Sequence, residues 1–250
     1  MGGWLVKHLM VRSQKLKPWT VNRQLSLGSY FAELEIGCGP NGSGKTTLTK
    51  ALRETYAVPL GQYLNPDDIA KHIDLPALLG ETVDKALLQD ELAARLAQKI
   101  SLGLRDDWIR DRLSFTYESV MSHESHLDFV KSARNSGYKP YLYYVCTSDP
   151  ELNEERITQR VALGGHSVPK EKVFGRYQRS LRYLSGMIQL CYRAYFFDNS
   201  TTKLTFLGEA TPDGFLDIVE ESFDNVQPMW LYKNVMTSWD ENKIRMIQPR

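Results

Sequence analysis

Short apolar runs alternate with amphipathic stretches along most of the chain. Apolar, β-branched and aromatic residues predict six strands, and the run "KPYLYYVCTS" at 139–148 is the most apolar of them. A strand that lacks polar alternation is typical of a central parallel strand buried on both faces. The six strands are predicted at 30–39, 62–65, 113–122, 139–148, 193–200 and 202–210.

Segments with helical periodicity separate most of these runs. The Ala- and Leu-rich stretch 75–112 is interpreted as two helices that split near Gly103 and cover the sheet. Strands that alternate with helices predict an α/β fold with a doubly wound, mostly parallel sheet. Further helices are predicted at 45–57, from Pro66, at 126–138 with an end at Gly137, and at 150–163 with Asp149 as the cap.

Composition and charge are those of an ordinary globular protein. Of the 250 residues, 42% are hydrophobic and 24% charged, and the formal net charge of +1 gives no reason to expect a nucleic-acid or membrane surface. No apolar run reaches the roughly 18 residues of a membrane span. Three widely spaced cysteines suggest neither a disulfide framework nor a zinc site. We therefore expect a cytoplasmic protein without a membrane partner.

The first 27 residues differ from the rest of the chain. They hold six Lys, Arg or His residues between Lys7 and Arg23 and no acidic residue, and Pro18 interrupts any helix. We interpret 1–27 as a basic surface extension and 28–250 as one domain.

A glycine-rich run joins the first predicted strand to the first predicted helix. "GPNGSGKT" matches the phosphate-loop pattern G-x-x-x-x-G-K-[ST], whose backbone N–H groups and helix N-terminus hold a polyphosphate. Lys45 would reach the β- and γ-phosphates, and the Thr46 hydroxyl would be a Mg²⁺ ligand. A glycine turn that matches by chance is the alternative. The expected nucleotide contacts are Gly39, Pro40, Asn41, Gly42, Ser43, Gly44, Lys45, Thr46 and Thr47.

The loop alone does not separate ATPases, GTPases and kinases. The chain contains no LSGGQ-like signature and no N/T-K-x-D guanine motif. The most apolar strand ends in Thr147 and Ser148, where an aspartate often stands, and Asp149 is better used as a helix cap. This departure favours a kinase, in which another strand end supplies the acidic residue.

Carboxylates follow or interrupt two other predicted strands. Asp67 and Asp68 follow the second strand, where a carboxylate could accept the proton of a substrate hydroxyl or orient metal-bound water. The alternative for this pair is a helix cap stabilised by the helix dipole. Glu118 lies within a strand-like run and is predicted to contact substrate, with a glutamate on an exposed face as the alternative.

A basic segment follows the fourth strand. Between Arg156 and Arg193 there are eight Lys or Arg residues and one acid. A helix with Arg156 and Arg160 on one face, a glycine hinge with His166, and a helix with Arg176 predict a closing lid over about 156–182. A solvated basic surface and a nucleic-acid patch are the alternatives, and the second is the less favoured.

In this order and spacing, these segments resemble the zeta-toxin-like P-loop kinases, in particular the bacterial branch often described as predicted ATPases. The resemblance covers about residues 33–200. It depends on "GPNGSGKTT", "LNPDDIA", "SFTYESVMS", "YVCTSDPELNEERITQRVALGGHSVP", "GRYQRSL" and "RAYFFDNS".

The resemblance implies an ATP- and Mg²⁺-dependent kinase that acts on a small molecule. The best-known toxins of this family phosphorylate a hydroxyl of UDP-N-acetylsugars and are restrained by an antitoxin protein. Residue by residue, it implies that Lys45 is the phosphate-loop lysine and Asp67 the general base. It implies that Glu118 is the glutamate of the substrate strand and that Arg156 or Arg160 lies near the γ-phosphate.

Several positions depart from the family pattern. "TYES" replaces Phe-Glu-Thr, Tyr192 stands where relatives often have aspartate, and Glu33 and Glu35 lie in a strand that is normally more apolar. His166 stands about where some toxins have a second phosphate-binding arginine, so that Arg176 would have to supply this charge.

We expect an ATP-dependent kinase that transfers the γ-phosphoryl group to a small hydroxyl-bearing acceptor. Lys45, Asp67 and Arg160 are the predicted catalytic residues, and Asp68 joins Glu118 in contacting the acceptor. An ATP hydrolase or nucleotide switch without an acceptor, and a non-catalytic nucleotide or nucleic-acid binder, are the alternative functions.

Overall fold

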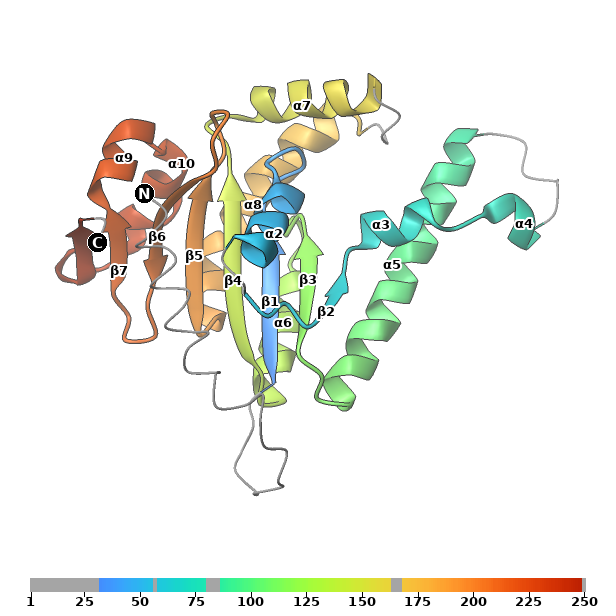
Figure 1. Cartoon of the computed structure of the whole chain (residues 1–250), viewed down its shortest axis with the longest axis horizontal. Helices are drawn as coiled ribbons and strands as arrows, with labels where there is room; N and C mark the ends of the chain where they lie inside the picture. Colours follow the sequence, from blue (N-terminus) through green and yellow to red (C-terminus); the bar gives the residue numbers. More distant parts are fainter. Residues whose placement is uncertain (1–31, 56–57, 80–85, 163–167, 249–250) are drawn as a thin grey trace.

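The computed structural model describes residues 32–55, 58–79, 86–162 and 168–248, and its centre is a single eight-stranded sheet (Figure 1). The strand order is β2-β3-β1-β4-β5-β6-β7-β8. The strands are β1 Glu33–Cys38, β2 Gln62–Leu64, β3 Phe115–Ser119, β4 Lys139–Cys146, β5 Arg193–Asp198, β6 Thr205–Ala210, β7 Leu216–Val219 and β8 Ile244–Ile247. The predicted extension at 1–27 and the hinge residue His166 lie outside the described residues.

Helices connect most of the strands. They are α2 Lys45–Glu54, α3 Pro66–Lys71, α4 Leu75–Leu79, α5 Ala86–Arg110, α6 Ser125–Asn135, α7 Pro150–Ala162, α8 Lys170–Leu190, α9 Glu220–Val226 and α10 Met229–Asn234. Among the residues described, none of the helices combines the length and the hydropathy that are needed to cross a bilayer.

Five neighbouring strands run parallel. β2, β3, β1, β4 and β5 pair in parallel, whereas β6 is antiparallel to both β5 and β7. The predicted α/β fold with a doubly wound, mostly parallel sheet is therefore confirmed. This order places β1 between β3 and β4, so that the loop after β1 emerges near the middle of the parallel part.

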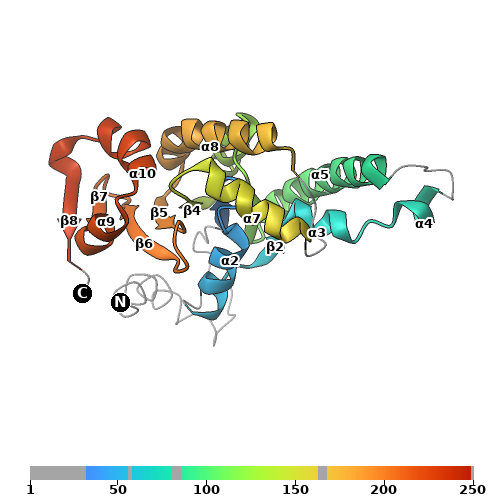
Figure 2. The same ribbon diagram turned by 90° about the horizontal axis from the view of Figure 1, so that it is seen from above.

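Helices pack on both faces of the sheet (Figure 2). α6, α8 and α10 lie on one face and α2 on the other. β4 contributes to both cores because alternate residues point to opposite faces: Leu142 and Tyr144 pack into the larger core, and Tyr143 and Val145 into the smaller one under α2. The prediction of a strand buried on both faces is confirmed.

Capping residues fix two of the helices that border the site. The Asn65 side chain accepts the Asp67 N–H at 2.9 Å at the start of α3. The Asp149 carboxylate accepts the Leu152 N–H at 2.9 Å at the start of α7, with Pro150 as the first helical residue. Asp149 therefore caps a helix, as its position in the sequence predicts.

One predicted helix boundary is wrong. α5 is continuous from Ala86 to Arg110 and passes through Gly103, although the sequence suggests a split there. Among its described residues, the 75–112 stretch forms α4 at Leu75–Leu79 and α5 at Ala86–Arg110. A single exposed glycine costs a helix only about 1 kcal/mol, which is too little to end α5.

Candidate phosphate-loop site

The phosphate loop lies between the end of β1 and the start of α2, as predicted. Gly44 has φ 95°, a left-handed conformation that favours glycine, and its carbonyl accepts the Leu48 N–H at 2.9 Å. α2 therefore starts at Lys45, and its free N–H groups and its dipole lie at the carboxyl end of the parallel strands. This is the arrangement that holds phosphate groups.

The Lys45 side chain folds back onto the phosphate loop. Its Nζ donates to the Pro40 carbonyl at 3.1 Å. Burial lowers the pKa of Lys45, the Glu118 and Asp67 carboxylates act in the opposite direction, and the Arg160 charge lowers the pKa further. Two of the three predicted carboxylates, Glu118 and Asp67, therefore lie close enough to Lys45 to act on its charge, as does the predicted Arg160.

Glu118 lies in β3 beside the first turn of α2. Only 5% of its surface is exposed, so the alternative of a glutamate on an exposed face is wrong. Its carboxylate accepts hydrogen bonds from Thr46 Oγ1 at 3.3 Å, Thr49 Oγ1 at 3.4 Å and the Tyr63 hydroxyl at 2.7 Å. Three donors from β2 and α2 thus stabilise a buried carboxylate next to the predicted Mg²⁺ ligand.

The two aspartates after β2 have different surroundings. Asn65 is the residue that caps α3, and Asp67 and Asp68 both lie in its first turn. The Asp68 carboxylate forms an ion pair with Lys71 at 2.7 Å. The Asp67 side chain is exposed and accepts no hydrogen bond from the residues that the structure describes, so its carboxylate is open to a ligand.

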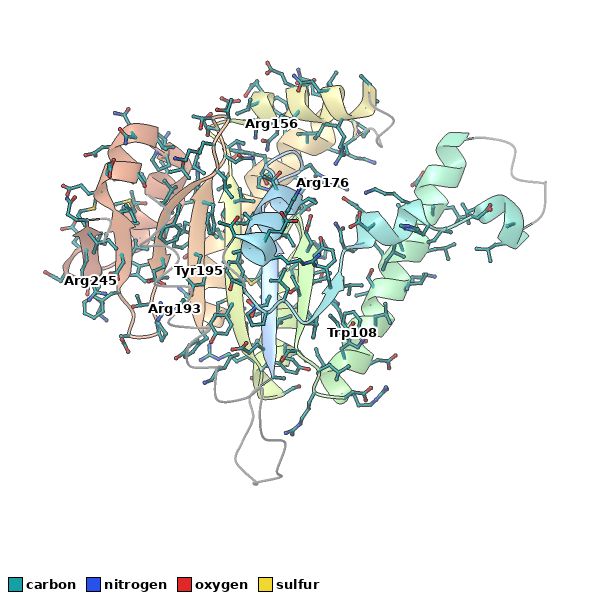
Figure 3. The ribbon with its side chains drawn as sticks, in the orientation of Figure 1. Trp108, Arg156, Arg176, Arg193, Tyr195 and Arg245 are labelled. Atoms are coloured by element: carbon teal, nitrogen blue, oxygen red, sulfur yellow. The ribbon has the colours of Figure 1, made fainter. Side chains whose placement is uncertain are left out.

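Arginines from α7 and α8 lie at the same end of the sheet as the loop (Figure 3). Arg176 Nη1 donates to Asn41 Oδ1 at 3.3 Å and thus contacts the loop directly. Burial lowers the pKa of Arg176, whereas the Asp67 charge raises it. Arg156 Nη2 donates to the Thr201 carbonyl at 3.4 Å, and its buried Nη1 has no partner among the described residues.

The comparison with protein families matches the same part of the chain. The family model described as "Zeta toxin" matches residues 36–197, which includes the loop, both aspartates, Glu118 and the arginines. The chain belongs to the zeta toxin family. The predicted resemblance is thereby confirmed, and the family and the fold together support a P-loop kinase.

Relatives of this zeta toxin family protein include one curated sequence and several solved structures. An uncharacterized protein of Haemophilus influenzae is 31% identical over 140 residues, which are 56% of this chain and 89% of the relative.

The AvrRxo1-ORF1:-ORF2 complex with ATP has TM-score 0.58 at 16% identity and covers 89% of this chain and 67% of that one. A structure from the PezAT chromosomal toxin–antitoxin system of Streptococcus pneumoniae has TM-score 0.53 at 13% identity, with 96% and 90% covered. At these identities the solved structures show the fold.

Three residues near the loop were missed by the sequence predictions for this zeta toxin family chain. Thr49 and Tyr63 bind Glu118, and Asn199 donates to the Ser43 carbonyl. The spacing of Thr49 from Thr46 would have placed both on one face of α2. Tyr63 lies in β2 and Asn199 in the turn after β5, and only the folded sheet brings them to the loop.

The residues at the loop fit a magnesium ion that is bound together with a nucleotide. Among the described residues there is no group of three or more His, Cys, Asp or Glu side chains that could hold a metal by themselves. Thr46 is exposed at the start of α2 and offers a hydroxyl oxygen, the ligand type that Mg²⁺ prefers. Phosphate oxygens and water would supply the other ligands.

Proposed function

We propose that the protein is an ATP-dependent kinase that transfers the γ-phosphoryl group to a hydroxyl of a small molecule. The observation that carries the proposal is the exposed carboxylate of Asp67, which is close enough to Lys45 and Arg176 to act on the charge of both. A carboxylate so placed can accept the proton of an attacking hydroxyl beside the cations that neutralise the phosphates.

In this proposal the other residues bind and orient the nucleotide. The loop amides and Lys45 hold the β- and γ-phosphates, and Arg160, Arg156 and Arg176 neutralise charge on the transferred group. Bound Mg²⁺ would neutralise charge on the phosphate oxygens, and Thr46 would hold it. The proposed reaction forms no covalent intermediate with the protein, so positioning and electrostatics supply the catalysis.

Glu118 is proposed to orient the Thr46 hydroxyl as well as the acceptor. A hydroxyl that binds a metal through its oxygen still has a proton to donate, and Glu118 Oε1 lies 3.3 Å from Thr46 Oγ1 to accept it. Its second oxygen, Oε2, already accepts from Thr49 and Tyr63. Contact of Glu118 with the acceptor would therefore have to form at the edge of this carboxylate, and Asp68 is the second proposed acceptor contact.

The test is transfer of a phosphoryl group from ATP to a panel of acceptors that includes UDP-N-acetylsugars, followed by mass spectrometry. Asp67→Asn should lower transfer by about 10²–10⁴-fold, the usual contribution of a general base, and leave ATP binding intact. Asp107→Asn is the matched control, because Asp107 is an exposed carboxylate of α5 that pairs with Arg110 at 2.8 Å, away from the loop.

Three results would contradict the proposal. If Asp67→Asn transferred phosphoryl groups at the rate of the wild type, Asp67 would not be the general base. Consumption of ATP that is the same with and without every acceptor would favour the ATP hydrolase. ATP binding that falls steeply with salt and survives Lys45→Ala would instead favour a non-catalytic binder.

An antitoxin protein remains a proposed partner. The support is the family and the likeness to a structure from a toxin–antitoxin system. If the proposal holds, expression of the chain should arrest growth of a host cell, and Asp67→Asn should abolish the arrest. A protein encoded beside this one that relieves the arrest and co-purifies with the chain would be the antitoxin.

A further inference from the structure

In the turn after β5, Asn199 contacts the phosphate loop. The residue lies beyond the part of the chain that matches the family, 36–197. Its backbone N–H donates to the Cys146 carbonyl at 2.8 Å, which continues the pairing of β5 with β4. Its side-chain Nδ2 donates to the Ser43 carbonyl at 2.9 Å, across 156 residues of sequence.

The accepting carbonyl belongs to the peptide that joins Ser43 to Gly44. Because a trans peptide is planar, its C=O and N–H point in opposite directions. A hydrogen bond that holds the Ser43 carbonyl outward, toward Asn199, therefore turns the Gly44 N–H toward the opposite side, where the loop receives phosphate. A Cβ on Gly44 would overlap the Asn199 amide, so the two residues are in close contact.

Asn199 is itself anchored on a buried hydrogen-bond pair. Asp198 is 2% exposed, and its Oδ1 accepts the Ser200 N–H at 2.7 Å. Its Oδ2 accepts Trp230 Nε1 from α10 at 2.8 Å. Trp230 is 3% exposed and packs against Tyr144, with ring centroids 5.6 Å apart. The backbone on both sides of Asn199 is thus fixed before any ligand binds.

We propose that Asn199 is a positioning residue for the phosphate loop, and that the Asp198–Trp230 pair aligns it. Asn199 orients the Ser43–Gly44 peptide so that the Gly44 N–H is ready to bind a phosphate oxygen. The inference rests on the nucleotide-binding part of the proposed function. It gives the C-terminal elements a role in nucleotide binding, because α10 supplies Trp230.

The test compares the affinity for ATP and ADP, measured by titration calorimetry, across matched variants. Asn199→Ala should weaken both nucleotides about three- to tenfold, the effect of one lost hydrogen bond between neutral groups. Asn199→Asp should weaken them more than Asn199→Ala, because its carboxylate would face the Ser43 carbonyl oxygen. Trp230→Phe keeps an aromatic ring but loses the donor, and should weaken binding about two- to threefold.

Thr211→Ala is the control. The Thr211 hydroxyl also donates to a backbone carbonyl, that of Phe215 at 3.2 Å, and Thr211 is half-buried like Asn199 but contacts neither Asp198 nor Trp230 through the hydrogen bonds of the described residues. This variant should bind nucleotide like the wild type even if its stability in urea falls as much as that of Asn199→Ala. In addition, amides of residues 39–47 should exchange with deuterium faster in the Asn199 variants than in Thr211→Ala, without nucleotide present.

The proposal is overturned if Asn199→Ala binds ATP within twofold of the wild type, or if its loop amides exchange as in Thr211→Ala. A wild type that binds ATP but transfers no phosphoryl group would contradict the proposed function and not this inference. Where transfer is observed, Asn199→Ala should raise KM for ATP and leave KM for the acceptor unchanged, a split that a general loss of folding does not produce.

Discussion

At the scale of single residues, His126 in α6 should make the free energy of unfolding depend on pH. The ring lies 3.3 Å from Ser119 Oγ, and burial lowers its pKa from 6.5 to about 4, helped by the charges of Arg105 and His123. Between these pH values the unfolded chain binds a proton that the folded chain does not. Stability should therefore fall as the pH drops from about 6.5 to about 4, by on the order of 3 kcal/mol for the full shift.

Urea unfolding at pH 7, 5.5 and 4.5 measures this contribution. His126→Gln should lose less stability than the wild type over this range, because glutamine has no proton to gain. The same substitution at the exposed His72 is the control for the change from histidine to glutamine itself. If the free energies of unfolding of the wild type and His126→Gln changed equally with pH, His126 would not be the source of the pH dependence.

A site residue can be predicted from the sequence when its role depends on residues close to it in the chain. Lys45 and Thr46 could be predicted because the loop pattern fixes their chemistry within a few residues. Asp67 follows from its place after a strand. The hydrogen bonds of Glu118 with Tyr63, and of Ser43 with Asn199, join segments that only the sheet brings together, and no local pattern encodes them.

At the scale of helices, two glycines with equal space around them should respond in opposite ways to alanine. An added Cβ would meet nothing within 4 Å at either Gly103 or Gly137. Gly103 lies inside α5, so Gly103→Ala should stabilise the protein by about 0.5–1 kcal/mol. Gly137 follows α6 with φ 89°, and Gly137→Ala should destabilise it by about 1 kcal/mol.

Denaturant midpoints of the two variants, measured beside the wild type, check this pair. Shifts of the same sign would show that backbone conformation does not decide the effect. The same contrast explains why the predicted end of a helix at Gly137 is correct and the predicted split near Gly103 is wrong. Glycine ends α6 because the chain turns left-handed there, and it fails to end α5 because nothing after Gly103 breaks the helical pattern.

At the scale of the whole molecule, a buried carboxylate joins the last strand to the sheet. Arg245 of β8 binds Asp217 of β7 through two hydrogen bonds, of 2.6 and 2.8 Å. Arg245→Met should cost about 1–2 kcal/mol, because it leaves a buried carboxylate without its partner while the arginine itself is about half exposed.

The matched control for this pair is Arg95→Met. Arg95 binds Glu91 at 2.8 Å, but both side chains are largely exposed, so the change should be within about 0.5 kcal/mol. Unfolding free energies in urea give both values. Equal losses in the two variants would mean that burial of Asp217 has no energetic consequence.

The parallel part of the fold could be predicted from the sequence, and the C-terminal edge could not. β1, β3, β4 and β5 are apolar runs between helical segments, which is a strong pattern for parallel sheets. β7 and β8 are four residues each, and β8 has two exposed residues in its middle. Their pairing joins residues 28 apart, such as Asp217 and Arg245, and a strand of four residues is too short to show a clear periodicity.

The position of β1 in the sheet also decides when the nucleotide site can form during synthesis. β1 pairs with β3 and β4, which a ribosome makes later, so a nascent chain that ends after α2 has a loop strand without neighbours. The hydrogen bond from Asn199 to the loop comes later still. Truncated or unfinished chains of this zeta toxin family protein should therefore lack a complete nucleotide site. The complete site should form only after most of the chain has left the ribosome.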